Sequence, residues 1–166
     1  MSIQVGDRIP DAILSESTEF GQACPVAPGK VSVAEATKKK RVIIFGLPGA
    51  YTPTCSGKHV PGYVARLDDF KAKKIDEVWC VSVNDGYVMA AWGRDQKAIG
   101  KVRMLGDGNG DFAKKLGLEI DMNGAGMGTR MKRFSMLVDD GTVKALHVEA
   151  PGKFEVSDAE SMLRQL

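Results

Sequence analysis

The feature that most constrains this fold is an alternation of short apolar runs with longer segments of helical periodicity. Residues 42–47 form an apolar run rich in β-branched side chains, and Pro48-Gly49 ends it, which is typical of a strand buried on both faces. Over residues 53–74, apolar side chains recur at the spacing of one helix face. This alternation predicts an α/β fold in which helices cover a parallel or mixed central sheet.

The same two patterns place the remaining elements. We expect strands at 78–83 and 102–105, a hairpin of 134–138 and 143–148 around the turn at 139–142, and helices at 87–99 and 111–116. A last helix should begin near Ser157, where Glu160 completes a capping box, and Pro61 should bend the 53–74 helix. The first forty residues, with Gly and Pro at many positions, should hold only short strands. Because no repeat or linker interrupts the pattern, we expect residues 1–166 to form one domain.

Composition and charge exclude several classes of protein. Apolar residues make up 43% of the chain and charged residues 27%, which argues against a membrane span and against wholesale disorder. The 23 basic and 21 acidic residues leave a net charge of +2, too little for a dense basic face that would bind nucleic acid. The basic run at 38–41 is expected to be a solvated helix end or turn. The first residues carry no apolar run of the kind found in signal peptides, so we expect a cytoplasmic protein without membrane contact.

Three cysteines, Cys24, Cys55 and Cys80, are an odd number, and no two of them have the C-x-x-C spacing. A disulfide framework is therefore not expected. With only two histidines, His59 and His147, the chain also offers too few well-spaced ligands for a zinc site. The sequence thus predicts free thiols, either reactive or inert.

Cys55 stands where a helix should activate a thiol. Thr52 is a good N-cap and Pro53 suits the first helical position, so Cys55 falls in the first turn. The free N–H groups and the positive end of the helix dipole there stabilise a thiolate. Pro48-Gly49, just before, leaves the backbone free to approach a ligand. The alternative is that Cys55 is a small buried helix residue and Thr52 only a cap.

Other functional interpretations of the segment around Cys55, and of residues 107–111, are weaker. His59 lies four residues after Cys55, so a Cys–His pair for acyl transfer is geometrically possible, although such a histidine is more often a packing or surface residue. A phosphate loop ending at Gly57-Lys58 would need a glycine where Thr52 stands. Residues 107–111 begin like a calcium loop, but the required glycine and glutamate are missing farther on, so we expect a turn and a helix cap.

The run Pro48-Gly-Ala-Tyr-Thr52-Pro-Thr-Cys55 resembles the active-site motif of peroxiredoxins, Pro-x-x-x-Thr/Ser-x-x-Cys. Residues 80–88 and 130–141 extend the likeness in the same order and narrow it to the type II, or peroxiredoxin-five-like, subfamily. The resemblance implies a thioredoxin-like fold with an N-terminal extension, usually as a homodimer. It also implies a thiol peroxidase for hydrogen peroxide and alkyl hydroperoxides that needs neither a metal nor an organic cofactor.

The resemblance further assigns roles to residues. Cys55 would be the peroxidatic cysteine, which attacks the peroxide as thiolate and becomes a sulfenic acid, and Thr52 would hydrogen-bond the peroxide oxygens. Arg130 would be the arginine that stabilises the thiolate and the leaving oxygen. Pro48 would shield the site from water, and the N–H groups of Gly49 and Cys55 would donate to the substrate.

The chain departs from family members that carry a resolving cysteine near the C-terminus, because that stretch holds none. We therefore expect glutathione with glutaredoxin as the reductant. The alternative is thioredoxin acting through Cys80, a possible resolving cysteine, although a thiol in the middle of a buried strand is more often inert. Cys24 is expected to be a bystander. From another class, the chain could be a redox sensor or holdase that signals through oxidation of Cys55.

Overall fold

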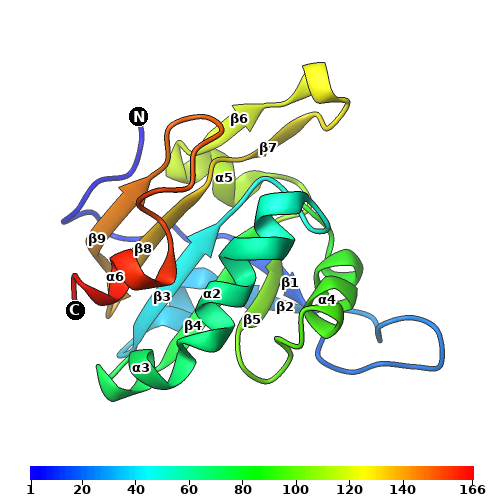
Figure 1. The fold of residues 1–166 in the computed structure, drawn as a ribbon, viewed down its shortest axis with the longest axis horizontal. Coiled ribbons are helices and arrows are strands. Elements are labelled where there is room, and N and C mark those ends of the chain that lie inside the picture. The colour runs from blue at the N-terminus through cyan, green and yellow to red at the C-terminus, as the bar shows by residue number, and fades with distance from the viewer.

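The computed structural model describes all 166 residues and is built on a seven-stranded mixed sheet (Figure 1). Its strand order is β2-β1-β5-β4-β3-β8-β9. The central strands β3 (Arg41–Gly46), β4 (Glu77–Ser82) and β5 (Arg103–Gly106) run parallel, which confirms the predicted buried strands. The antiparallel hairpin β8 (Phe134–Asp139) and β9 (Thr142–Val148) extends one edge, and β1 (Ile13–Glu16) and β2 (Gly29–Ser32) extend the other.

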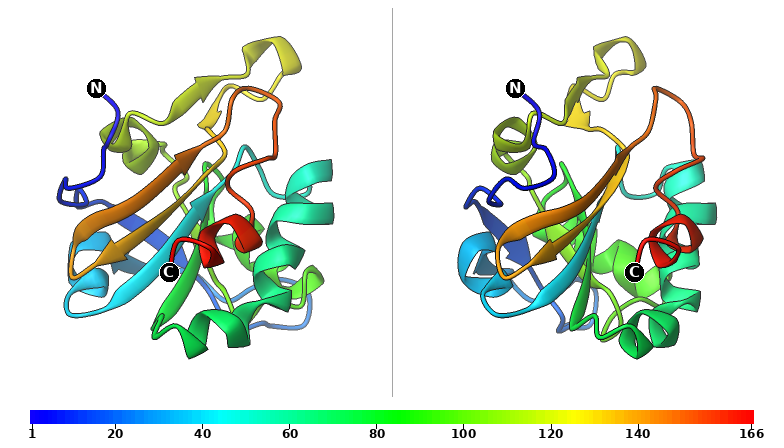
Figure 2. Two further views of the ribbon diagram at one scale, coloured as in Figure 1. Left: turned by 60° about the vertical axis from the view of Figure 1, so that its left-hand side comes forward. Right: turned by 90° about the vertical axis from the view of Figure 1, so that its left-hand side faces the viewer.

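Two apolar cores lie on opposite faces of the sheet, because successive strand side chains point in opposite directions. In β3, Val42 and Ile44 join one core, while Ile43 and Phe45 join the other. The first core is covered by α1 (Val33–Thr37) and α5 (Asp111–Leu116), and the second by α2 (Val60–Ala65), α3 (Leu67–Ala72), α4 (Gly86–Asp95) and α6 (Ala159–Leu163). The right-hand view of Figure 2 shows these two layers on either side of the sheet.

The helix predicted over residues 53–74 is present, but it is divided. A π-helical turn, η1 (Cys55–His59), precedes α2, and a break at Arg66 separates α2 from α3. Pro61 explains the π turn, since a proline has no N–H with which to continue the α-helical ladder. Instead the N–H of Val60 reaches back five residues to the carbonyl of Cys55. The irregular part of this helix thus begins at the predicted nucleophile.

The N-cap of the last helix was predicted one residue too early. The cap of α6 is Asp158, whose carboxylate accepts from the N–H of Ser161. Ser157 is instead buried, and its hydroxyl donates to Glu149. A buried serine that already has a carboxylate partner is not available as a cap, so the next polar residue takes that position.

Two further elements differ from the prediction. The first forty residues contain the short helix α1 as well as strands, with Ser32 as its cap. A small hairpin of β6 (Glu119–Asp121) and β7 (Thr129–Met131), joined by η2 (Asn123–Ala125), was not expected. The 111–116 helix is confirmed, and Asp107 caps it through the N–H groups of Phe112 and Ala113, as a turn and cap would.

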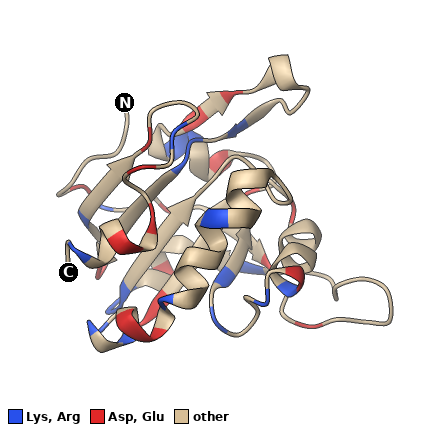
Figure 3. Ribbon diagram, in the orientation of Figure 1, with Lys and Arg blue, Asp and Glu red and all other residues tan.

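The surface agrees with the balanced composition. In Figure 3, basic and acidic residues are interspersed along the ribbon. Residues 38–40 of the basic run are exposed and form the turn that follows α1, as predicted. None of the helices combines the length and the apolar character needed to cross a membrane.

Candidate active site

The motif loop between β3 and the following helix is tied to the carboxyl end of β4. The hydroxyl of Ser82 donates to the carbonyl of Leu47 at 3.1 Å and to Oδ1 of Asn84 at 2.8 Å. Oδ1 of Asn84 also accepts from the N–H of Ala50 at 3.0 Å. Tyr51, next in the loop, has a left-handed backbone with φ of 62°, a conformation that costs energy and persists where surrounding contacts enforce it. These contacts fix the chain just before the predicted nucleophile.

Thr52 and Cys55 lie at the start of the helix, as the sequence predicts. The carbonyl of Thr52 accepts from the N–H of Ser56, and helical structure begins at Pro53. The hydroxyl of Thr52 does not cap this helix but donates to the carbonyl of Gly49 at 2.7 Å. Cys55 is fully buried in the second core. Its thiol therefore sits in the first turn, shielded from bulk water.

The cation next to the Cys55 sulfur is Arg133, not Arg130. Nη2 of Arg133 donates to Sγ of Cys55 at 3.1 Å. The guanidinium of Arg130 instead donates to the carbonyls of Met127 at 2.8 Å and Pro48 at 3.3 Å. The predicted contact of Arg130 with the sulfur is therefore wrong in this structure, and the arginine three residues later makes it.

Strand pairing explains which of the two arginines reaches the sulfur of Cys55. Arg130 lies in β7, which pairs only with β6, so its side chain turns back onto its own loop. Arg133 directly precedes β8, and Phe134 at the start of β8 pairs with Gly46 at the end of β3. This register brings residue 133 to the carboxyl end of β3, where the Cys55 helix begins. The sequence shows both arginines but not the register, so it could not choose between them.

Gly49 has a structural use that the sequence did not reveal. A Cβ at Gly49 would lie 2.8 Å from Nη1 of Arg130, closer than real contacts allow. The missing side chain therefore makes room for Arg130 against the motif loop. The prediction that Gly49 leaves its backbone open to a ligand is not tested by this contact.

His59 is fully buried one turn after Cys55, and it contacts Arg133 rather than the thiol. Its Nδ1 accepts from Nη1 of Arg133 at 2.9 Å, and its Nε2 lies 3.1 Å from the carbonyl of Ser157. Because a guanidinium only donates and a carbonyl only accepts, the two contacts fit only the tautomer with the proton on Nε2. Burial and the charge of Arg133 lower the pKa of His59 to about 3. A Cys–His hydrolase pair is therefore not formed.

Neither Cys80 nor Cys24 lies at the start of a helix. Cys80 pairs with Phe45 in the centre of the sheet and is fully buried. Burial, with a smaller contribution from Cys55, raises the pKa of the Cys80 thiol well above its usual value. Cys24 is exposed in the loop before β2. No three His, Cys, Asp or Glu side chains come together as a metal site would require.

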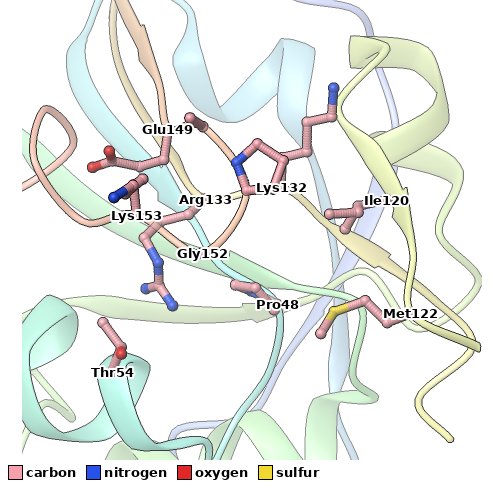
Figure 4. Close-up of a pocket in the computed structure, with 11 residues that line it drawn as sticks. Pro48, Thr54, Ile120, Met122, Lys132, Arg133, Glu149, Gly152 and Lys153 are labelled. Atoms are coloured by element: carbon pink, nitrogen blue, oxygen red, sulfur yellow. The ribbon is translucent and has the colours of Figure 1, made fainter. Parts of the chain in front are cut away.

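A cavity of about 220 Å³ lies next to the motif loop and Arg133 (Figure 4). Pro48, Thr54 and Arg133 line it, together with Lys132 and Lys153. In Figure 4 the guanidinium of Arg133 points from the strand side toward Thr54 and Pro48. The residue that contacts the sulfur therefore also faces the cavity, which gives a small polar molecule a route toward the site.

Comparison with known proteins identifies the family to which this chain belongs. The Redoxin family matches residues 4–163. The chloroplastic peroxiredoxin-2E of Arabidopsis thaliana is 44% identical over 99% of this chain and 70% of its own length. This chain belongs to the type II peroxiredoxins.

Solved structures support the assignment to the peroxiredoxins. Reduced Prx3 from Vibrio vulnificus in complex with H2O2 is 44% identical, with a TM-score of 0.89 over 98% of both chains. A Burkholderia cenocepacia protein described as a putative thioredoxin reductase is 54% identical, with a TM-score of 0.95 over 100% of this chain and 99% of that one. As a peroxiredoxin, the protein has the predicted thioredoxin-like fold and is a thiol peroxidase, an oxidoreductase that reduces a peroxide at the expense of a thiol.

Proposed function

We propose that Cys55 is the peroxidatic nucleophile and that Arg133 takes the role expected of Arg130. The observation that carries this assignment is the 3.1 Å contact from Nη2 of Arg133 to Sγ of Cys55. A cation that donates directly to sulfur favours the thiolate, which is the reactive form of a cysteine. Cys55 is also the only cysteine at a helix start, where backbone N–H groups add to that effect.

The proposed reaction balances as a two-electron transfer. The Cys55 thiolate attacks the nearer oxygen of the hydroperoxide, a sulfur–oxygen bond forms, and the oxygen–oxygen bond breaks. Sulfur gives up two electrons and becomes a sulfenic acid, while the departing oxygen leaves as hydroxide or alkoxide and takes up a proton. Arg133, which faces both the sulfur and the cavity, is placed to stabilise the charge that develops on this oxygen.

Thr52 and the motif loop would orient the peroxide. The hydroxyl proton of Thr52 goes to the carbonyl of Gly49, so the lone pairs of Oγ1 remain free to accept from the O–H of the peroxide. Pro48 lines the cavity and would exclude water, and the N–H groups of Gly49 and Cys55 would donate to the peroxide oxygens. Each of these roles follows from the resemblance to the peroxiredoxin motif, and the position of Pro48 in the cavity wall supports the role given to it.

We propose glutathione, with glutaredoxin, as the source of electrons for the second half-reaction. The support is the position of Cys80, which is fully buried in the central sheet and whose thiol has a raised pKa, because a buried, protonated thiol is a poor nucleophile. An external thiol would attack the sulfenic sulfur, release water and leave a mixed disulfide, which a second thiol would reduce. Reduction by thioredoxin through Cys80 is the alternative, and a redox sensor would not turn over at all.

One experiment separates these outcomes. Hydrogen peroxide consumption is measured with glutathione and glutaredoxin, or with thioredoxin and its reductase, as the only electron donor. Turnover with the first pair, together with a single glutathione adduct at Cys55 by intact-protein mass spectrometry, supports the proposal. Turnover with thioredoxin alone would refute the proposed reductant, and no turnover with either would refute the catalytic cycle.

We also propose that the protein is a homodimer. Beyond the family resemblance, Tyr51 and Tyr87 are about half exposed although they are large aromatic side chains. Burial of such rings is typical of an interface between protein chains. Light scattering on the purified protein measures the mass directly, and a monomer at micromolar concentration would contradict this proposal.

A further inference from the structure

Arg133 is held by a neutral partner. Its Nη1 donates to Nδ1 of His59 at 2.9 Å, while Nη2 donates to Cys55. None of the ion pairs in the structure includes Arg133, so no carboxylate oxygen lies within 4.0 Å of its guanidinium. Partly buried arginines usually pair with carboxylates, and this one pairs with an imidazole instead.

A neutral acceptor suits the chemistry at this position. A carboxylate would fix the guanidinium equally well, but its negative charge would offset the field that stabilises the thiolate and the leaving oxygen. A neutral imidazole fixes one edge of the guanidinium and leaves its full charge directed at the sulfur. Since the pKa of His59 is lowered to about 3, the imidazole stays neutral throughout the physiological range.

The imidazole is itself fixed from the far side. The carbonyl of Ser157 lies 3.1 Å from Nε2 of His59 and sets its tautomer. The carboxylate of Glu149 accepts from the N–H of Ser157 at 2.8 Å and from its hydroxyl at 2.7 Å, so this carbonyl is held in place. The rings of Phe45 and Phe154 pack on His59, with centroids 4.8 Å and 5.0 Å away.

We propose that His59 is a positioning residue of the peroxidase, which holds Arg133 against the Cys55 sulfur as an uncharged acceptor whose tautomer is set by the Ser157 carbonyl. This inference rests on the proposed roles of Cys55 and Arg133. It links Ser157, in the segment between β9 and α6, to the reactivity of the Cys55 thiol through His59 and Arg133. A histidine that only fills the core would not affect the thiolate once the fold is intact.

The test compares His59→Met with His59→Gln. The two replacement side chains have similar size and both lose the aromatic packing, but only glutamine has an oxygen that can accept from Arg133. Oxidation of Cys55 by hydrogen peroxide is followed in a single turnover without reductant, and thiolate formation is followed by the pH dependence of iodoacetamide alkylation. In His59→Met, we expect Cys55 to be oxidised about 10- to 100-fold more slowly than in the wild-type protein. The midpoint of its alkylation by iodoacetamide should lie about one pH unit higher. His59→Gln should recover most of both losses.

Two controls isolate the route through Arg133. Tyr63→Phe removes the other hydrogen bond to the Ser157 carbonyl, which Tyr63 makes at 2.9 Å, and should retain more than half of the wild-type rate. In an Arg133→Gln background, the difference between Met and Gln at position 59 should disappear. If His59→Met and His59→Gln both lose their native circular dichroism, His59→Phe is used in place of His59→Met, because it keeps a ring in the core. It is then compared with the wild-type protein.

The outcomes distinguish this inference from the proposed function. Equal rates and equal alkylation midpoints for His59→Met and His59→Gln, or a difference that persists without Arg133, would overturn the role of His59. A native-like His59→Phe with the wild-type rate and midpoint would overturn it as well. Peroxide turnover by Cys55→Ser would instead overturn the proposed nucleophile, whatever the variants at position 59 do.

Discussion

Replacing Arg133 should impair the peroxidase far more than replacing Arg130, although the two residues are three positions apart. At 3.1 Å from Sγ, a unit charge on Arg133 attracts the thiolate by about 5 kcal/mol for an effective dielectric constant of about 20. This value is an upper limit, because water and backbone N–H groups replace part of the lost charge. Removal of one oxyanion donor in other enzymes costs about 2.7–4 kcal/mol, or about 10²- to 10³-fold in rate, and we take that range for Arg133→Gln.

The matched variant is Arg130→Gln. Arg130 donates only to neutral carbonyls, those of Met127 and Pro48, so its loss should slow oxidation by less than about tenfold through slight movement of the motif loop. The assay is stopped-flow oxidation of Cys55 by hydrogen peroxide. The fluorescence of Trp92 can report the reaction, since its Nε1–H donates to the hydroxyl of Ser56 at 3.0 Å, next to Cys55. If Arg130→Gln slowed oxidation as much as Arg133→Gln, the assignment from geometry would be refuted.

Three further predictions concern the thiols and pH. Cys55→Ser should abolish turnover, because a serine hydroxyl stays protonated near neutral pH; retention of a tenth of the wild-type rate would contradict the proposal. Cys80→Ser should leave glutathione-dependent turnover nearly unchanged, and a dominant oxidised species two mass units lighter than the reduced chain, absent from Cys80→Ser, would show an internal disulfide instead. The pKa of His59 is lowered to about 3 in the folded protein, so below pH 6.5 this histidine becomes protonated in the unfolded chain but stays neutral in the folded chain. The free energy of unfolding should therefore fall between about pH 6.5 and pH 3, by at most about 1.4 kcal/mol per pH unit from this group, and urea titrations should show a shallower fall in His59→Gln.

The central strands could be predicted from the sequence because they are buried on both faces. Residues 42–47 and 78–83 are predominantly apolar, and β3 and β4 lie within one residue of those bounds. The β6–β7 hairpin could not be found in the same way, since its strands have only three residues each and a glycine-rich loop between them. Helix α1, with five residues, is likewise too short for helical periodicity to be recognised.

The candidate site was predictable as far as local geometry determines it. Thr52, Pro53 and Cys55 follow from helix-start rules, which depend only on neighbours in the chain. Arg133 depends on the pairing of Gly46 with Phe134, a contact between segments 88 positions apart, and no local pattern encodes that register. The motif match over residues 130–141 reached the correct segment, but it could not show which arginine faces the sulfur.

The burial of Cys55 places different demands on the two half-reactions. Hydrogen peroxide is small enough to approach through the cavity beside Pro48 and Arg133, so oxidation can proceed with the helix start intact. A glutathione thiol must bring a tripeptide to a sulfur whose residue has no exposed surface, and this requires the first turn to open. That turn is joined to the π-helical segment η1, where Pro61 has already interrupted the regular ladder, and it is tied to α4 by the hydrogen bond from Trp92 to Ser56. Opening therefore breaks few regular helical bonds, but it also breaks two specific side-chain contacts of this turn, the hydrogen bond from Trp92 to Ser56 and the one from Arg133 to Cys55.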